Sequence, residues 1–256
     1  MTRPSSRTAL ITGGNRGLGR AAALALAADG TDVVLTYRGN ADEATAVVGE
    51  VEALGRRAAA LQLDTTVPGS FAAFAETLAA TLQDVFGRET FDVLVNNAGY
   101  AGWTPFGEMT EEVLDELLAV HVKGPILLTE LLAPSVADGG RIVFVSTGLT
   151  RFVANPAYSA YASAKGAIEV YTKYAAKALG ARAITVNVLA PGATATDFAG
   201  GVIRDDEDYR AMISGLVAFG RIGEPDDIGG AVRAIASESA GWVTGQRIEA
   251  SGGQAL

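Results

Sequence analysis

The sequence predicts an α/β fold in which a single domain is built on one doubly wound parallel sheet of about seven strands, with helices on both faces. Short runs rich in β-branched residues alternate with longer helical patterns from one end of the chain to the other. The strand runs are continuously apolar, as expected of strands that are buried on both faces. No linker, repeat or low-complexity segment interrupts the alternation, so residues 1–256 are expected to form one domain.

Strand and helix patterns follow one another at regular intervals. The expected strands are residues 8–12, 32–37, 58–62, 92–96, 141–146, 184–190 and 246–249. The expected helices are residues 16–29, 41–54, 70–86, 110–132, 158–179, 205–216 and 225–237. Residues 191–223 depart from this regularity, with Gly-rich turns and an acidic run. A long excursion of this kind often covers a site, so residues 193–222 are expected to be a substrate lid or an ordinary surface hairpin of helices.

Composition and charge exclude several classes of function. The formal net charge is −9 and there is no basic block, which argues against nucleic acid or an anionic membrane as a partner. The chain has no Cys, a single His and no clustered carboxylates, so neither thiolate chemistry nor a metal site is expected. The first residues lack the apolar core of a signal peptide, and the longest apolar run, residues 21–28, is too short to span a bilayer. A cytoplasmic location is expected.

A glycine-rich loop, TGGNRGLG at residues 12–19, follows the first expected strand and opens the first helix. Glycines let the backbone turn sharply and approach a pyrophosphate, and the helix N-terminus offers free N–H groups. In this position the loop predicts a dinucleotide site on a Rossmann-type sheet. The loop residues expected to contact the cofactor are Gly13, Asn15, Arg16, Gly17, Leu18 and Gly19.

The end of the second expected strand indicates which dinucleotide binds. An NAD-binding chain usually ends this strand with an acid that accepts hydrogen bonds from the ribose 2′-hydroxyl. Here Tyr37 and Arg38 stand at this end, and no acid occurs until Asp42. Arg38, with Arg16 from the glycine loop, is suited to pair with a 2′-phosphate, so NADP(H) is predicted. The alternative is that both arginines are solvated surface residues.

Tyr161 and Lys165 lie four residues apart in an expected helix, on one face and one turn apart. A phenol has a pKa of about 10, and a nearby ammonium lowers it by roughly 1–3 units. The pair is therefore a candidate acid and base for a carbonyl or alcohol oxygen. The alternative is that both residues merely occupy the surface of an amphipathic helix.

Six motifs in a fixed order carry a resemblance to a known family. They are residues 12–19, Asn96-Asn97-Ala98-Gly99, residues 161–165, residues 187–192, residues 220–228 and residues 244–253. Over essentially its whole length the chain resembles the short-chain dehydrogenase/reductases, and in detail it is most similar to members that act like 3-oxoacyl-carrier-protein reductases. The resemblance implies an oxidoreductase that interconverts a ketone and a secondary alcohol, with NADP(H) carrying the hydride.

The resemblance also implies roles for individual residues. Tyr161 would give and take the proton, while Lys165 would lower its pKa and bind the nicotinamide ribose. The implied cofactor contacts beyond the glycine loop are Asp64 at the adenine, with Asn96, Ala98, Gly99, Pro191, Gly192, Thr194 and Thr196. A homotetramer or homodimer is implied, with contacts through helices 110–132 and 158–179 and the last strand.

Two departures from the family pattern leave questions open. The family places a catalytic Ser just past the fifth strand, and here either Ser146 or Thr147 fits that place. His121, the only His, stands where the family usually has an Asn thought to hold a water in a proton relay. His121 is expected to be structural, to substitute in the relay, or to be a true acid or base.

Tyr158 introduces a competing reaction, because its spacing to Lys165 resembles the wider Tyr–Lys spacing of enoyl reductases. The alternatives to a ketone reductase are therefore an enoyl reductase that uses Tyr158 and a catalytically silent protein that binds a dinucleotide. The substrate is expected to be an apolar small molecule, since large apolar residues occur near strand ends and in loops: Tyr100, Trp103, Phe106, Phe152 and Val153.

Overall fold

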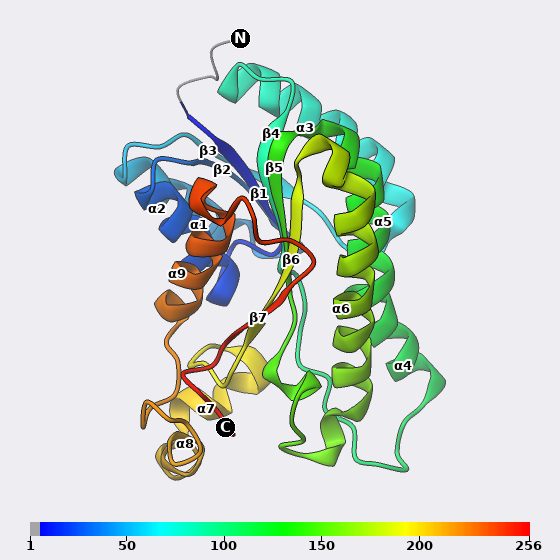
Figure 1. The fold of residues 1–256 in the computed structure, drawn as a ribbon, viewed down its shortest axis with the longest axis vertical. Helices are drawn as coiled ribbons and strands as arrows, with labels where there is room; N and C mark the ends of the chain where they lie inside the picture. Colours follow the sequence, from blue (N-terminus) through cyan, green and yellow to red (C-terminus); the bar gives the residue numbers. More distant parts are fainter. Residues whose placement is uncertain (1–5) are drawn as a thin grey trace.

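The computed structural model describes residues 6–256, except for the side chain of Ala199, and it contains one parallel sheet of seven strands (Figure 1). The strands are β1 (Thr8–Ile11), β2 (Asp32–Tyr37), β3 (Ala58–Gln62), β4 (Phe91–Asn96), β5 (Val136–Val145), β6 (Thr185–Pro191) and β7 (Arg247–Ala250). Their order is β3-β2-β1-β4-β5-β6-β7, and every neighbouring pair is parallel. The order reverses direction at β1, so a crevice is expected at the carboxyl ends of β1 and β4.

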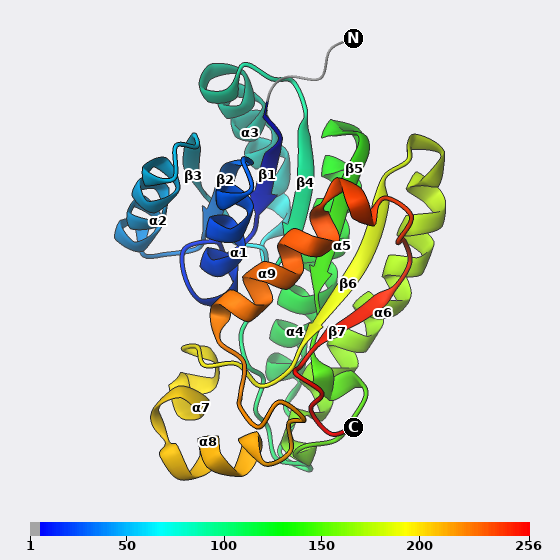
Figure 2. The same cartoon turned by 60° about the vertical axis from the view of Figure 1, so that its left-hand side comes forward.

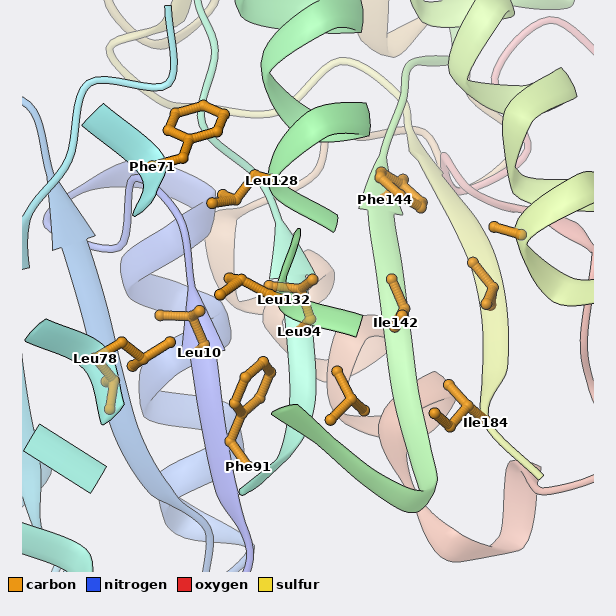
Figure 3. Packing of buried hydrophobic residues seen from close by; sticks show 14 of the residues in the cluster. Leu10, Phe71, Leu78, Phe91, Leu94, Leu128, Leu132, Ile142, Phe144 and Ile184 are labelled. Carbon is orange, nitrogen blue, oxygen red and sulfur yellow. The ribbon is translucent and has the colours of Figure 1, made fainter. Parts of the chain in front are cut away.

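Helices cover both faces of this sheet, as predicted. One face carries α1 (Gly17–Ala28), α2 (Ala41–Ala53) and α9 (Pro225–Ala236), and the other carries α3 (Phe71–Phe86), α4 (Glu111–Leu118), α5 (Gly124–Leu132) and α6 (Ser159–Leu179). Alternate strand residues point to opposite faces, so Leu10 enters one apolar core and Ile11 the other. Figure 3 shows the first core, in which Leu132 of α5 lies beside Leu94 of β4, and Ile142 of the neighbouring strand belongs to the same cluster.

Strand β5 begins five residues earlier than the sequence pattern predicts. Residues 136–140 contain two glycines and an Asp, a composition typical of a turn. In the structure Val136 pairs with Phe91, and the register shifts before Val93 pairs with Arg141. A bulge at this point absorbs the turn-like residues into the strand, and Gly139 adopts a left-handed φ of +73° there.

The expected helix 110–132 is interrupted near its middle. Residues Ala119–Lys123 form a π-helical turn that joins α4 to α5 and contains His121. Single π turns inside helices occur frequently at functional sites. The interruption turns His121 toward the carboxyl ends of the strands, where its ring lies 5.1 Å from that of Tyr161.

The segment 193–222 lies beyond the carboxyl ends of the strands and contains two short helices, α7 (Val202–Asp205) and α8 (Glu207–Ser214), shown in Figure 2. The single helix expected over residues 205–216 is broken at Asp206, whose carboxylate accepts a hydrogen bond from Tyr209 N and caps α8. The two ends of the segment are joined, because Gly223 N donates to Ala193 O at 2.9 Å.

Among the described residues, one helical stretch, Glu111–Ser135, is long and apolar enough to cross a membrane, a test that the core helices of soluble proteins also pass. The sequence analysis considered only unbroken apolar runs, and acidic residues interrupt this stretch, so it was not predicted. Leu117, Leu128 and Leu132 of the stretch are buried against the rest of the domain. Packing in the core therefore accounts for part of the apolar composition of this stretch, in which Leu118, Leu127 and Leu131 are exposed.

Candidate active site

A cavity of about 540 Å³ opens at the carboxyl ends of the central strands. The glycine loop, residues 97–101, residues 145–149, the beginning of α6 and the segment 193–222 all contribute to its walls. This is the crevice that the reversal in strand order predicts, and it brings together motifs that lie far apart in the sequence.

The glycine loop forms the floor of the cavity and is closely packed. Gly13 has a φ of +63°, and a Cβ on Gly19 would lie 2.2 Å from Gly13 O. The Asn97 amide fixes the loop by donating to Thr12 O and Gly13 O, both at 3.0 Å. The first turn of α1 has neither a capping side chain nor an acidic residue, so its N–H groups and positive dipole end are available. These features fit a dinucleotide pyrophosphate.

Two arginines and an aspartate line the end of the cavity next to β2. Burial raises the pKa of Asp64, but hydrogen bonds from Thr66 and the charge of Arg38 outweigh this effect and leave the pKa below its usual range. Arg16 and Arg38 thus place two guanidinium groups where the glycine loop meets β2, which suits the 2′-phosphate of NADP(H).

Three of the residues expected at the cofactor lie outside the cavity wall. Gly19 sits beneath the loop, where it permits close packing, and Tyr37 is half-buried against one of the two apolar cores. The alternation of side chains along β4 sends Asn96 toward α5, where its amide donates to Thr129 Oγ1 at 3.0 Å. The other expected cofactor residues line the cavity: Gly13, Asn15, Arg16, Gly17, Leu18, Arg38, Asp64, Ala98, Gly99, Tyr161, Lys165, Pro191, Gly192, Thr194 and Thr196.

Tyr161 and Lys165 are both buried in the wall of the cavity. The Lys165 ammonium lies 5.9 Å from the centre of the Tyr161 ring and donates to Val145 O at 2.7 Å. Burial lowers the pKa of Lys165 to about 8. Burial also raises the pKa of Tyr161, although a hydrogen bond from Thr147 opposes the shift. The expected lowering of the phenol pKa by Lys165 is therefore not found in this arrangement, where desolvation dominates.

The two candidate hydroxyls after β5 have different partners. Ser146 Oγ donates to Glu169 Oε1 at 2.8 Å. The Thr147 side chain instead accepts from Leu149 N at 3.3 Å, lines the cavity and acts on Tyr161 as a hydrogen-bonding group that lowers the pKa of the phenol. Both residues line the cavity, and of the two only Thr147 contributes to the pKa shift of Tyr161.

His121 is buried between two tyrosines. Its ring lies edge-on to Tyr161, with 5.1 Å between ring centres. Its Nε2 lies 3.0 Å from Tyr100 O, and because a carbonyl only accepts, Nε2 carries the proton. Burial and the charge of Lys165 lower the pKa of His121 to about 2, so the ring is neutral at neutral pH.

Aromatic side chains surround the part of the cavity in front of Tyr161. Of the aromatic and apolar residues predicted to face a substrate, Tyr100 and Phe152 line the cavity, as does Tyr158. Trp103 lies outside the wall and packs edge-on against Tyr158, with ring centres 5.3 Å apart. Phe106 and Val153 are exposed and do not line the cavity.

Residues that the sequence reasoning missed complete the wall. The segment 193–222 contributes Phe198, whose ring centre lies 5.8 Å from that of Tyr161. Near the C-terminus, Gln254 is buried, lines the cavity and accepts from Ala193 N at 2.8 Å. No local pattern marks these residues, because only the folded chain brings them to the site. Asn97 belongs to a motif recognised in the sequence, where a cap that satisfies backbone groups is one expectation, and its amide does bond to the backbone, at Thr12 O and Gly13 O.

Comparisons with known proteins agree with this geometry. The family model described as enoyl-(acyl carrier protein) reductase matches residues 13–255. An uncharacterized oxidoreductase of Methylorubrum extorquens is 38% identical over 99% of both chains. A 3-oxoacyl-[acyl-carrier-protein] reductase of Synechocystis sp. is 34% identical over 100% of both chains.

Solved structures of two ketoreductases are also similar. The angucycline C-6 ketoreductase LanV with bound NADP is 40% identical over 98% of this chain and 96% of that one, with a TM-score of 0.91. The promiscuous reductase LugOII, which catalyses keto-reduction at C1 during lugdunomycin biosynthesis, is 38% identical over 98% of both chains, with a TM-score of 0.91. The chain belongs to the short-chain dehydrogenase/reductase family and is an NADP-dependent oxidoreductase of the carbonyl reductase type.

Proposed function

We propose that this enzyme reduces the ketone of a bulky, largely apolar substrate to a secondary alcohol, with Tyr161 as the proton donor. One observation carries the proposal: Tyr161, Thr147 and the glycine loop lie in the wall of the same cavity. A reacting carbonyl in this cavity would find a proton donor next to the cofactor site.

In this proposal each side chain of the site has a separate role in the reduction. When bound, NADPH supplies a hydride for the carbonyl carbon. Tyr161 transfers its phenolic proton to the carbonyl oxygen, and its raised pKa keeps that proton in place at neutral pH. The Thr147 hydroxyl orients the phenol and stabilises the phenolate that remains. Lys165, whose ammonium lies 5.9 Å from the centre of the Tyr161 ring, would hold the nicotinamide ribose and contributes positive charge below about pH 8.

We infer that the substrate is a fused-ring aromatic ketone. Tyr100, Phe152, Tyr158 and Phe198 give the cavity flat apolar walls suited to stacking against rings. The similar ketoreductase LanV has been solved with NADP and rabelomycin, at 39% identity and a TM-score of 0.87.

We infer that His121 serves as a neutral hydrogen-bond acceptor and not as an acid. With its proton on Nε2, its Nδ1 is an acceptor without a hydrogen-bond partner among the described residues, and the same holds for Asn96 Oδ1. Both residues and Lys165 line a second cavity of about 10 Å³, room for one water molecule. A water there would accept from Lys165 and donate to both acceptors, which suits the relay that the family's Asn serves.

Single substitutions of the two tyrosines test the catalytic assignment. Tyr161→Phe should lower kcat for ketone reduction by roughly 10²–10⁴-fold while NADPH still binds, as measured by fluorescence titration. Tyr158→Phe is the matched control, on the same helix end and in the same cavity, and should retain most of the turnover. Loss of turnover in Tyr158→Phe with activity kept in Tyr161→Phe would refute the assignment.

Enoyl reduction is the second candidate, because the matching family model carries that description. It predicts that an α,β-unsaturated substrate is reduced at its double bond in a reaction that needs Tyr158. Following NADPH absorbance with a panel of aromatic ketones and enones, and identifying the products by mass, separates the reactions. Reduction of enones alone would favour the second candidate. Cofactor binding without turnover on the whole panel would favour a silent dinucleotide-binding protein.

We also propose that the enzyme assembles as a homotetramer or homodimer through the outer faces of α4, α5 and α6. Exposed apolar side chains gather there, among them Leu118, Leu127, Leu131 and Tyr174. An exposed apolar patch on a domain of high net charge is typical of a surface between subunits.

A further inference from the structure

A polar network behind the cavity ties the loop after β5 to α6 and β7. At its centre is Glu169, which lies two turns beyond Tyr161 on α6, about 12 Å along the helix axis. A single oxygen, Glu169 Oε1, is 2.8 Å from Ser146 Oγ, 2.7 Å from Thr150 Oγ1 and 3.0 Å from Arg247 Nε. Glu169 is not part of the cavity wall, so it acts on the site through other residues.

Arg247 carries the network from Glu169 to the backbone of the catalytic loop. Its Nη2 donates to Thr147 O at 3.2 Å, and its Nη1 donates to Glu249 Oε2 at 3.0 Å. Glu249 also accepts two hydrogen bonds from Arg151, each 2.7 Å long, at the far end of the loop. Hydrogen bonds therefore join both ends of the loop 146–151 to residues of β7.

This arrangement restrains the backbone that carries the Thr147 side chain. The Ser146 hydroxyl donates its only proton in a hydrogen bond to Glu169, and Arg247 donates to the carbonyl oxygen of Thr147. With the residue before it and its own carbonyl held, the Thr147 side chain is restrained in the cavity wall that it shares with Tyr161. Side chains of Glu169 and Arg247 are only 18% and 23% exposed, so their bond is partly shielded from water.

We propose that Glu169 and Arg247 are positioning residues that act through Thr147, holding its hydroxyl at hydrogen-bond distance from the Tyr161 phenol, with Ser146 as part of the same brace. The inference rests on the proposed role of Thr147 in ketone reduction. A misplacement of about 1 Å at a reacting group can cost roughly 10²-fold in rate, so a brace outside the cavity matters for turnover.

A double-mutant cycle on kcat tests the proposal. Glu169→Ala should lower kcat for NADPH-dependent ketone reduction by roughly 10- to 100-fold in the otherwise unchanged enzyme. In the Thr147→Ala background the same change should cost less than about twofold, because residues that act as one unit are not additive. Equal losses in both backgrounds would overturn the proposal, as would full activity of Glu169→Ala.

A matched control separates positioning from loss of stability. Asp92 is a buried carboxylate paired with Arg88 at 2.9 Å, and it lies at the opposite end of the sheet, at the beginning of β4. Asp92→Ala should lower the melting temperature without lowering kcat of the folded enzyme. NADPH affinity, measured by fluorescence titration, should be unchanged in Glu169→Ala and in Asp92→Ala. Loss of NADPH binding in Glu169→Ala would contradict the proposed route through Thr147.

The pH profile of alcohol oxidation gives a second readout. Oxidation needs the phenolate, and the Thr147 hydrogen bond lowers the pKa of Tyr161, so losing this bond raises the pKa. The rising limb of the profile should move to higher pH in both Glu169→Ala and Thr147→Ala. A limb that moves in Thr147→Ala and stays in place in Glu169→Ala would overturn the proposal.

Two further variants cover the case in which Glu169→Ala does not fold. Glu169→Gln keeps an acceptor oxygen and should recover part of kcat, whereas Arg247→Met should reproduce the loss and the shifted limb. Full activity in Arg247→Met would overturn the proposal. If Thr147→Ala itself lost no activity, the proposed role of Thr147 would fail and the brace with it. A loss in Thr147→Ala alone would overturn only the brace.

Discussion

Lys165 is the residue whose acid–base behaviour the fold changes most clearly. Burial lowers its pKa from 10.5 to about 8, because a charged ammonium is poorly solvated inside the protein. Between about pH 8 and 10.5 the unfolded chain therefore binds more protons at this residue than the folded one. The free energy of unfolding therefore rises with pH across that window. Below about pH 8 the buried ammonium destabilises the folded state by the full amount.

We therefore expect Lys165→Met to unfold less readily than the unchanged enzyme at pH 7 while losing turnover. The shift from 10.5 to about 8 corresponds to a difference of up to about 3 kcal/mol in unfolding free energy. The gain should shrink as the pH rises from about 8 to 10.5, and urea unfolding at several pH values measures it. A difference that is constant with pH would contradict this explanation.

Gly19 has the least room for a side chain at the cofactor site. A Cβ there would lie 2.2 Å from Gly13 O and 2.6 Å from Asn97 Nδ2. Gly19→Ala should push the glycine loop out of place and abolish NADPH binding in fluorescence titrations. Gly49→Ala, inside α2 with open space around it, is the control and should stabilise the enzyme by up to about 1 kcal/mol. Normal NADPH affinity in Gly19→Ala would show that the loop is less constrained than its packing indicates.

His121 should be silent in the pH dependence of the reaction. Burial and Lys165 hold its pKa at about 2, so its charge does not change near neutrality. The kcat profile for ketone reduction should show no limb between pH 5 and about 7, and should fall above about pH 8 as Lys165 loses its proton. A limb near pH 6.5 that disappears in His121→Asn would contradict the neutral assignment.

At the scale of elements, hydrogen bonds join the two ends of the segment 193–222, and apolar side chains of the segment line the cavity. Its base is closed by hydrogen bonds between residues 193–195 and Gly223, and α7 and α8 lie beyond it. Phe198 and Ile213 face the cavity, whereas Arg204 pairs with acidic residues at the surface. This division suits a lid that covers an apolar substrate.

Phe198→Ala should therefore raise KM for a fused-ring ketone by roughly tenfold or more, because burying a Phe side chain is worth about 1.5–3 kcal/mol. A small aliphatic ketone should show little change in KM. Phe219→Ala is the control, since this residue is 77% exposed, belongs to the same segment and does not line the cavity. Equal changes for both ketones would argue against a substrate contact by Phe198.

At the scale of the whole molecule, one of the two helical layers exposes several apolar side chains to solvent. Leu127 and Leu131 of α5 lie one turn apart, and Val170 and Tyr174 of α6 repeat the spacing. Helices α5 and α6 belong to the same layer (Figure 1). We expect this layer to pack against a second copy of the chain.

Replacing Leu127 and Leu131 together by Glu should reduce the oligomer to a smaller species, because charge in an apolar contact is strongly unfavourable. Light scattering after size-exclusion chromatography measures the mass. Leu54→Glu is the control, since Leu54 is similarly exposed next to α2 on the other layer. A monomeric unchanged enzyme would refute the proposed assembly.

Much of the fold followed from local patterns. Strands β2 and β3 have the bounds that their β-branched and apolar runs predict, and α2 differs by one residue. The pattern failed where long-range pairing or packing decides, as in the first half of β5 and in the π turn at His121. Both departures place residues with local turn or helix preferences in a conformation that the neighbouring elements stabilise.

By itself the sequence determined the family, the parallel sheet and the cofactor, because glycine spacing, strand alternation and the arginine after β2 act over a few neighbouring residues. Only the tertiary structure decided which partners Ser146 and Thr147 have, how the pKa values of Tyr161 and Lys165 shift, and which residues contact the loop after β5. These properties depend on burial and on contacts between segments up to 100 residues apart, such as Arg247 and Thr147. No local pattern encodes such contacts, so the folded chain alone sets them.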